Sequence, residues 1–286
     1  MIIETIHVDF DELTAMASEQ FSSGPRPKLL TPGTINSRLM PNFPSSTPVN
    51  PQVPTVIALE PAVLTDFSKG SVDPTLFIRK NDNDLLLVQI YVDDIIFDDP
   101  TLELCELFAN LMCSKFKMLM MGKISFFLGL QISQSPRDIF INQSKYALES
   151  LKKYGFESCD PVDTPMVEKS KLDEDKEGKA VDPSHYHGMI STLLYLTASR
   201  PDLQYAICMC ARYQARPTEK HVHAVKRIFR YLRGTVHRGL WYPNDSSVAL
   251  TAFVDADHAG CQDTRRSTSR SVLFLGERLI SWSLKR

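Results

Sequence analysis

Residues 85–97 read LLLVQIYVDDIIF and place two acidic residues between two apolar runs. Short apolar runs rich in Val and Ile are typical of buried β-strands, so the chain is predicted to fold back at Asp93 and Asp94. Neighbouring carboxylates repel each other, and burying either one is costly unless a cation or a hydrogen-bond donor compensates its charge. The stretch therefore predicts a β-hairpin with a charged tip.

A divalent cation is the natural compensation for this charge. Mg²⁺, or Mn²⁺ in its place, takes hard oxygen ligands and keeps positions for water and substrate phosphates. A site of that kind suits the transfer of a phosphoryl or nucleotidyl group. Taken alone, an Asp-Asp pair is more often only a polar turn between two strands.

The composition is that of an ordinary globular chain. Its 286 residues are 43% hydrophobic and 23% charged, which allows one or two domains and a sizeable core. The formal net charge of −2 argues against a nucleic-acid-binding protein. However, residues 200–238 hold nine Lys or Arg and two acidic residues, a local charge of +7. A nucleic-acid partner for this basic segment therefore remains open.

The cysteines and the N-terminus bear on the cellular compartment. The six cysteines form no CxxC pair and have no nearby His at zinc-finger spacing, so we expect reduced thiols. The N-terminus lacks a basic region followed by an apolar stretch, and no run approaches the ~18 apolar residues that cross a bilayer. We expect an intracellular protein that is not secreted and has no membrane partner.

Residues 1–72 are predicted to be a disordered Pro/Ser-rich linker with a short N-terminal helix. Residues 4–20 place apolar side chains along one helical face. Nine of the 18 prolines lie between Pro25 and Pro61, mixed with Ser, Thr, Asn and Gln. That composition cannot bury enough apolar surface to offset the entropy lost on ordering.

Beyond the hairpin, periodicity predicts mainly helices. The predicted elements are a helix at 101–117, strands at 124–132 and 139–141, a helix at 143–155, a mobile acidic connector at 168–182, and helices at 186–198, 202–215 and 218–233. The helix at 143–155 is expected to end at Gly155.

The last of these helices carries a basic stripe. Four basic residues are predicted to face outward: Lys226, Arg227, Arg230 and Arg233. Such a stripe replaces counterions along phosphates and binds nucleic acid without sequence preference. A charged outer helix face is also commonly just solvated. His221 and His223 are predicted to be surface residues rather than metal ligands.

Several sequence motifs occur together in one order. They are DPTLFIRKN, the hairpin, SKFKMLMMGKISFFLGLQI, INQSKYALESLKKYGF, TPM, YHGMISTLLYLTASRPDLQYAI, KHVHAVKRIFRYLRGT and FVDADHAGCQDTRRSTS. With these motifs, residues 73–286 resemble the Pol polyprotein of copia-type LTR retrotransposons. Because Tyr91 and the apolar strands match a reverse transcriptase palm, the resemblance favours a polymerase hairpin over a simple polar turn.

The resemblance implies an α+β fold. Residues 73–160 would form a partial reverse transcriptase palm and thumb, an antiparallel sheet with helices. Residues 161–245 would form a helical thumb or connection region, and 246–286 the truncated start of a ribonuclease H-like α/β domain. There, Asp255 ends a predicted strand and corresponds to the first metal-binding aspartate of the nuclease. Arg270 stands where the family usually has glycine, a substitution that costs ~1 kcal/mol or more if the turn requires a positive φ.

The resemblance also implies an activity. Intact family members are RNA-directed DNA polymerases that use Mg²⁺ or Mn²⁺ to join deoxynucleotide triphosphates to a template-primer of RNA or DNA. Asp93 would be the principal metal ligand, with Asp94 beside it and Tyr91 shaping the site against nucleic acid. Such proteins are found in cytoplasmic virus-like particles or in the nucleus.

The sequence departs from the family before the hairpin. Residues 1–72 contain nothing that resembles the fingers or the strand with a further metal-binding aspartate. Without oriented substrate binding, many orders of magnitude in rate are lost, so we expect a chain that does not polymerise by itself. The alternatives are a non-catalytic nucleic-acid-binding remnant of a transposable element and a poorly folded product with exposed strand edges.

Overall fold

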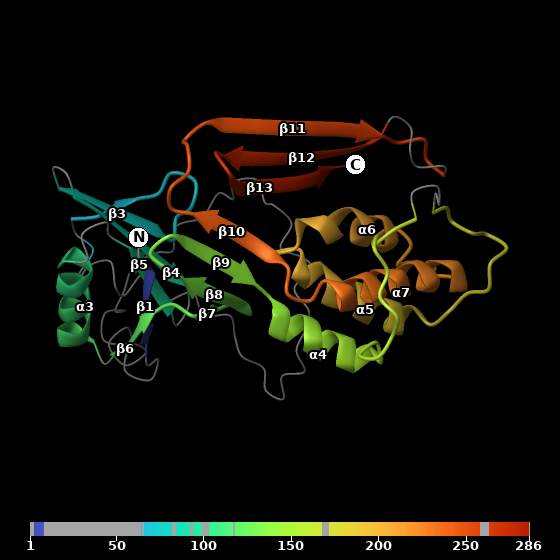
Figure 1. Cartoon of the computed structure of the whole chain (residues 1–286), viewed down its shortest axis with the longest axis horizontal. Helices are drawn as coiled ribbons and strands as arrows, with labels where there is room; N and C mark the ends of the chain where they lie inside the picture. Colours follow the sequence, from blue (N-terminus) through green and yellow to red (C-terminus); the bar gives the residue numbers. More distant parts are fainter. Residues whose placement is uncertain are drawn as a thin grey trace, which may run out of the picture. The chain divides into compact units, whose positions relative to one another are not determined.

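The computed structural model describes most of the chain after residue 63 and one short segment near the N-terminus. The described residues are 3–8, 64, 66–81, 84–91, 94–98, 103–116, 118–167, 172–257 and 263–285. They form two compact units, here called the first unit, up to Ser125, and the second unit, from Phe126. Helices and antiparallel sheets occur in both (Figure 1), which confirms the predicted α+β class.

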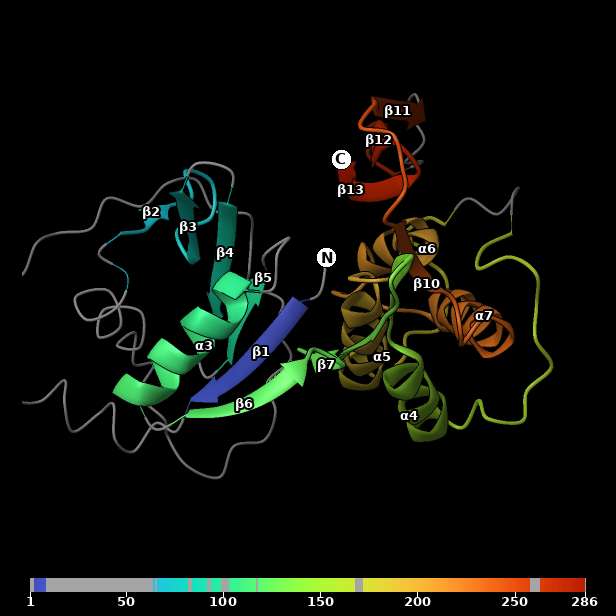
Figure 2. The ribbon, with the colours of Figure 1, turned by 60° about the vertical axis from the view of Figure 1, so that its left-hand side comes forward.

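The first unit is one antiparallel sheet with a helix on one face (Figure 2). The strands lie in the order β2-β3-β4-β5-β1-β6. Their bounds are β1 Ile3–Val8, β2 Ser68–Lys69, β3 Leu76–Asn81, β4 Asp84–Tyr91, β5 Asp94–Asp98 and β6 Met118–Lys123. Alternate residues of β4 and β5, such as Val88 and Phe97, are buried together with residues of helix α3 (Glu103–Lys115). The hairpin therefore has one buried face, whereas the sequence predicted strands that are buried throughout.

The predicted hairpin itself is confirmed. Strands β4 and β5 pair antiparallel, and Tyr91 lies directly opposite Asp94 in the register. The pair Ile90 and Ile95 comes next and is almost fully buried. The chain thus reverses at the predicted place, although Asp93 lies outside the described residues.

The N-terminal segment corrects a prediction. Strand β1 pairs antiparallel with β5 on one side and with β6 on the other, so the helix predicted from residue 4 is wrong for β1. Ile, Thr and Val favour strands, and pairing with two neighbouring strands overrides a weak helical periodicity. The rest of that predicted helix and the proline-rich segment lie outside the described residues.

Helix α3 matches its predicted span and packs one apolar face on the sheet. Its buried residues are Cys105, Phe108, Ala109 and Met112. Leu104 and Phe116 pack against the same core, whereas Leu107 is 64% exposed. The buried set follows the i, i+3, i+4, i+7 spacing of one helix face.

The second unit begins with a small sheet in the order β10-β9-β8-β7. Its strands are β7 Phe126–Phe127, β8 Leu130–Gln134, β9 Asp138–Asn142 and β10 Gly239–Pro243. The single strand predicted over 124–132 is divided by a turn at Leu128 and Gly129, where φ is 47° and 78°. Two positive φ values in a two-residue loop are typical of a type I′ hairpin turn. A leucine at the first position hid this turn from sequence reasoning.

Four helices form the larger core of the second unit (Figure 1). They are α4 Ser144–Tyr154, α5 Pro183–Leu196, α6 Pro201–Ala211 and α7 Glu219–Gly234, in agreement with the four predicted helices. Gly155 ends α4 with a φ of 74°, as predicted. Among the described residues, no helix combines the length and apolar character needed to cross a membrane.

A third sheet follows the helices. It is an antiparallel meander of β11 Leu250–Asp257, β12 Thr268–Leu275 and β13 Arg278–Lys285. Both Figure 1 and Figure 2 show it beside α6. The Trp282 indole donates a hydrogen bond to the Thr197 carbonyl (3.2 Å), and the Tyr242 hydroxyl donates to Leu279 (3.0 Å). These bonds attach the sheet to the helices and to β10.

Candidate metal and nucleic-acid sites

The open face of the β4–β5 hairpin carries two of the predicted site residues. Residues paired across antiparallel strands point to the same side, so Tyr91 and Asp94 share the face opposite buried Ile90 and Ile95. Tyr91 is 40% exposed and Asp94 is half-buried. The structure thus brings together two of the three predicted hairpin residues, and Asp93, outside the described residues, is not placed.

A third acidic residue in the first unit is fully engaged by donors. Asp73 Oδ1 accepts hydrogen bonds from the backbone N–H (2.9 Å) and hydroxyl (2.6 Å) of Thr75, and Oδ2 accepts one from Gln89 Nε2 (3.1 Å). These bonds, the Thr75 hydroxyl first, lower the pKa of Asp73. Asp followed two residues later by Thr is typical of an Asx turn. Asp73 therefore fixes the entry into β3.

A Mg²⁺ site makes specific demands on its ligands. The ion is octahedral and is usually held by one or two carboxylates together with water and substrate phosphates. No group of three or more His, Cys, Asp or Glu suited to a metal occurs within the described ranges, which omit Asp93. Asp94 is the described member of the predicted pair, and its hard oxygens fit the ion as one ligand.

Asp255 lies opposite an arginine. The register of β11 and β12 pairs Asp255 with Arg270, whose Nε donates to Asp255 Oδ2 at 2.7 Å. The Arg270 guanidinium also lies 5.6 Å from the ring centre of Tyr205. Arg270 sits in a strand without a positive φ, so the condition for the expected backbone strain is not met. The carboxylate that the resemblance assigns to a metal is thus paired with an exposed arginine.

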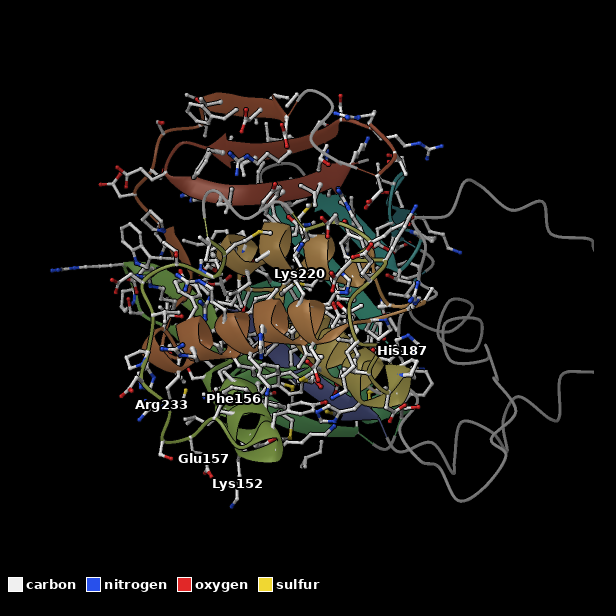
Figure 3. The ribbon with its side chains drawn as sticks, turned by 90° about the vertical axis from the view of Figure 1, so that its right-hand side faces the viewer. Lys152, Phe156, Glu157, His187, Lys220 and Arg233 are labelled. Atoms are coloured by element: carbon white, nitrogen blue, oxygen red, sulfur yellow. The ribbon has the colours of Figure 1, made fainter. Side chains whose placement is uncertain are left out.

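The predicted basic stripe on α7 has an intramolecular role. Lys226 and Arg233 are exposed and Arg227 and Arg230 are half-buried. Three of the four side chains donate to the segment that follows α4, and Figure 3 shows Arg233 beside Glu157. The bonds join Arg227 Nη2 to Thr164 Oγ1 (2.9 Å), Arg230 Nε to Asp160 O (3.0 Å) and Arg233 Nε to Glu157 O (2.6 Å). Each acceptor is neutral, so the bonds leave the charge of the stripe in place.

Sequence reasoning missed a buried ion pair at the start of α6 that is hydrogen-bonded to the end of α7. Arg200, 2% exposed, donates from Nε and Nη2 to Asp202 (2.9 and 2.7 Å) and from Nη1 to the Thr235 carbonyl (2.9 Å). The Tyr231 hydroxyl donates to Asp202 Oδ2 (2.9 Å). Burial raises the pKa of Asp202, but the hydrogen bonds and charge of Arg200 outweigh it and lower the pKa overall. The signal in the sequence was a charged pair around Pro201 between apolar helices.

His221 was predicted to be a surface residue, and that prediction is wrong. It is 0% exposed and stacks on Tyr213, with ring centres 4.3 Å apart. Its Nδ1 accepts from the Thr218 backbone N–H (3.0 Å), so Nε2 carries the hydrogen that bonds to the Asp173 carbonyl (2.8 Å). At the third helical position, a side chain can reach back to the cap in this way. His223 is exposed, as predicted.

Comparison with known proteins assigns the class. A family profile described as reverse transcriptase (RNA-dependent DNA polymerase) matches residues 61–168. An uncharacterized mitochondrial protein of Arabidopsis thaliana, AtMg00810, is 37% identical over 197 residues, 69% of this chain and 82% of that protein. The retrovirus-related Pol polyprotein from transposon RE1 of the same plant is 35% identical over 222 residues. The putative transposon Ty5-1 protein YCL074W of Saccharomyces cerevisiae is 27% identical over 222 residues.

The chain belongs to the reverse transcriptase family of copia-type retrotransposon Pol polyproteins, as its motifs predicted. The match to the RE1 polyprotein includes 77% of this chain but 15% of that polyprotein. In the match to YCL074W it spans 72% of the yeast protein. No solved structure matches the chain significantly.

Proposed function

We propose that the chain is a reverse transcriptase remnant that keeps the metal-binding hairpin of the palm but does not extend a primer by itself. The observation that carries this proposal is the pairing of Tyr91 with Asp94 at the end of a tight hairpin. In that hairpin Asp93 and Asp94 hold Mg²⁺ or Mn²⁺, and Tyr91 shapes the surface beside them. The proposal rests on the family and on this geometry together.

The bound ions would activate the primer 3′-hydroxyl and steady the pyrophosphate leaving group. The side chains of the hairpin would supply oxygen ligands where β4 ends and β5 begins. Residues 1–72 offer no segment like the fingers, which hold the deoxynucleotide triphosphate, and no motif with the further palm aspartate. Loss of oriented substrate binding removes most of the rate, so the hairpin alone is expected to be inactive.

Primer extension on an RNA template tests the proposal. The chain and its Asp93→Asn form are compared in Mg²⁺ and in Mn²⁺, and both are expected to incorporate no more nucleotide than a reaction without protein. Mn²⁺ binding, followed by electron paramagnetic resonance, is expected to weaken in Asp93→Asn but not in Asp245→Asn, which removes an exposed carboxylate of the second unit. Nucleotide incorporation that Asp93→Asn abolishes would overturn the proposed inactivity. Equal Mn²⁺ binding by all three proteins would remove the hairpin from the proposal.

A second function, nucleic-acid binding, is favoured by the basic residues on one side of α7. We propose that Lys226, Arg227, Arg230 and Arg233 contact the phosphates of a template-primer. Each phosphate contact adds about −0.9 to the slope of log affinity against log salt on a duplex, so four contacts predict a slope of roughly −3.6. Fluorescence anisotropy with an RNA–DNA hybrid measures the slope. An affinity that does not change with salt would contradict this function.

The third sheet is proposed to begin a ribonuclease H-like domain. Support comes from its three antiparallel strands and from the place of Asp255 near the end of β11. Because Arg270 occupies Asp255 as a partner, we expect no cleavage of an RNA–DNA hybrid, and Asp255→Asn is expected to behave like the natural chain. Cleavage that disappears in Asp255→Asn would assign a catalytic role to this aspartate.

A further inference from the structure

A cavity of about 540 Å³ lies at the C-terminal end of α7. Its lining residues are Leu148, Cys159, Pro161, Arg233, Gly234, Thr235, Val236, His237 and Arg238. Pockets for small ligands and cofactors commonly measure about 300–1,000 Å³. The cavity is therefore large enough for one nucleotide.

The charged side chains around the cavity all have one sign. Two arginines, Arg233 and Arg238, and the imidazole of His237 line it together with no acidic side chain. Arg233 Nε donates to the Glu157 carbonyl (2.6 Å), and Arg238 Nη1 donates to the Tyr231 hydroxyl (2.8 Å). These acceptors are neutral, and no ion pair to either arginine occurs in the described part of the chain. Both guanidinium groups are thus held in place with their charge uncompensated.

The helix dipole at the C-terminal end of α7 cancels only part of the positive charge of the two arginines. The C-terminus of a helix carries the equivalent of roughly −0.5 charge, which is about a quarter of the two guanidinium charges. The net potential in the cavity is therefore positive. Guanidinium groups bind phosphate and carboxylate oxygens with two parallel hydrogen bonds, so the cavity suits an oxyanion such as a phosphate.

One wall of the cavity is apolar. Leu148, from α4, and Pro161, from the segment that follows α4, both line the cavity, and Cys159 lies between them in sequence. A ligand that suits both walls has an apolar, flat part and an anionic part. A nucleotide has this chemistry, because its base packs on apolar side chains while its phosphate is charged.

We propose that this cavity binds one nucleotide of a nucleic-acid strand, with its phosphate on Arg233 and Arg238. The inference rests on the proposed nucleic-acid binding by α7, and it places one nucleotide of the bound strand at the C-terminal end of that helix. From Lys226 to Arg233 the helix rises about 10.5 Å, so the basic stripe runs along α7 toward the cavity at its C-terminal end. The stripe therefore guides the strand backbone to the cavity.

Cysteine alkylation of the natural chain tests the inference without a substitution. Cys159 lines the cavity, and Cys113, exposed in the first unit, serves as the internal reference. A 12-nucleotide thymidine strand at ten times its Kd leaves about one-eleventh of the protein free, so Cys159 is expected to react roughly tenfold more slowly, with Cys113 unchanged. The rates are measured by peptide mass spectrometry after a timed iodoacetamide pulse.

Inorganic phosphate at the same phosphate concentration forms the second arm. Equal protection of Cys159 by inorganic phosphate would show a site for free phosphate and would overturn the strand assignment. Binding of the oligonucleotide by anisotropy without protection of Cys159 would overturn the cavity while leaving the proposed nucleic-acid binding intact. Absence of any binding by anisotropy would overturn that function and the cavity together.

A matched pair of double variants gives an independent reading. Arg233→Gln with Arg238→Gln removes the cavity charge, and Arg137→Gln with Arg266→Gln removes the same charge from exposed positions elsewhere in the second unit. The first pair is expected to abolish protection of Cys159 and to reduce the salt slope by about 1.4, two contacts at roughly 0.7 each on a single strand. The second pair is expected to keep both. Equal slopes and equal protection in the two double variants would overturn the inference.

Discussion

Replacing Arg200 with methionine is expected to destabilise the second unit by about 3 kcal/mol. Removal of one partner of a buried ion pair costs about 3–5 kcal/mol because the other charge is left uncompensated. The lower end applies here, since the side chain of Asp202 is 32% exposed and keeps its hydrogen bond from Tyr231. Methionine preserves much of the length of the arginine side chain, so the loss of packing is small.

Tryptophan fluorescence is the appropriate assay for this variant. Both tryptophans of the chain, Trp241 and Trp282, lie in the second unit, so their emission reports its unfolding alone. For a unit of this size, 3 kcal/mol corresponds to a fall in Tm of about 6–12 °C. Arg270→Met is the control, because its ion pair with Asp255 is exposed and contributes roughly 0–1 kcal/mol. Equal falls in Tm for the two variants would refute the argument from burial.

Three further predictions concern the second unit and its thiols. Gly155→Ala is expected to lower the free energy of unfolding by about 1–2 kcal/mol, because its φ is positive. Gly129→Ala is expected to lower it more, because the added Cβ would also meet a tyrosine hydroxyl. Thermal unfolding of the two variants measures the difference. Burial raises the pKa of Cys210 to about 12, so at pH 8 it should resist alkylation until the unit unfolds, whereas Cys113 reacts at once, as mass spectrometry would show. The pKa of Asp202 is lowered, so its contribution to stability is present above the usual carboxyl pKa and is lost as the pH falls below about 4. The difference in Tm between the natural chain and Asp202→Asn is measured from pH 7 to 3 and should shrink below about pH 4.

Much of the architecture followed from local sequence signals. Apolar runs interrupted by Asp93 and Asp94 predicted the hairpin, and periodic apolar residues predicted the helices of the second unit. Gly155 marked a helix end because a left-handed conformation is easiest for glycine. These features depend on residues close together in sequence, so one chain suffices to find them.

Features that depend on distant residues could not be predicted in this way. Strand β1 is extended because two strands about a hundred residues away pair with it. His221 is buried because a connector closes over it, and Arg200 is buried because its acceptor Thr235 comes from the end of another helix. Local sequence carries no signal for partners of this kind. The sequence predicted the basic stripe, but its hydrogen bonds to the segment after α4 join residues that are more than sixty positions apart in the chain.

The position of β1 between β5 and β6 has a consequence for biosynthesis. The chain must be made as far as Lys123, 115 residues after Val8, before β6 can join β1. At about 5–20 residues per second, translation takes roughly 6–23 s to cover that interval. During this time β1 lacks at least one of its two partner strands, and the nascent N-terminal segment can bind chaperones. Ribosome profiling of chaperone-bound chains would therefore be expected to find occupancy that ends soon after this point has left the exit tunnel.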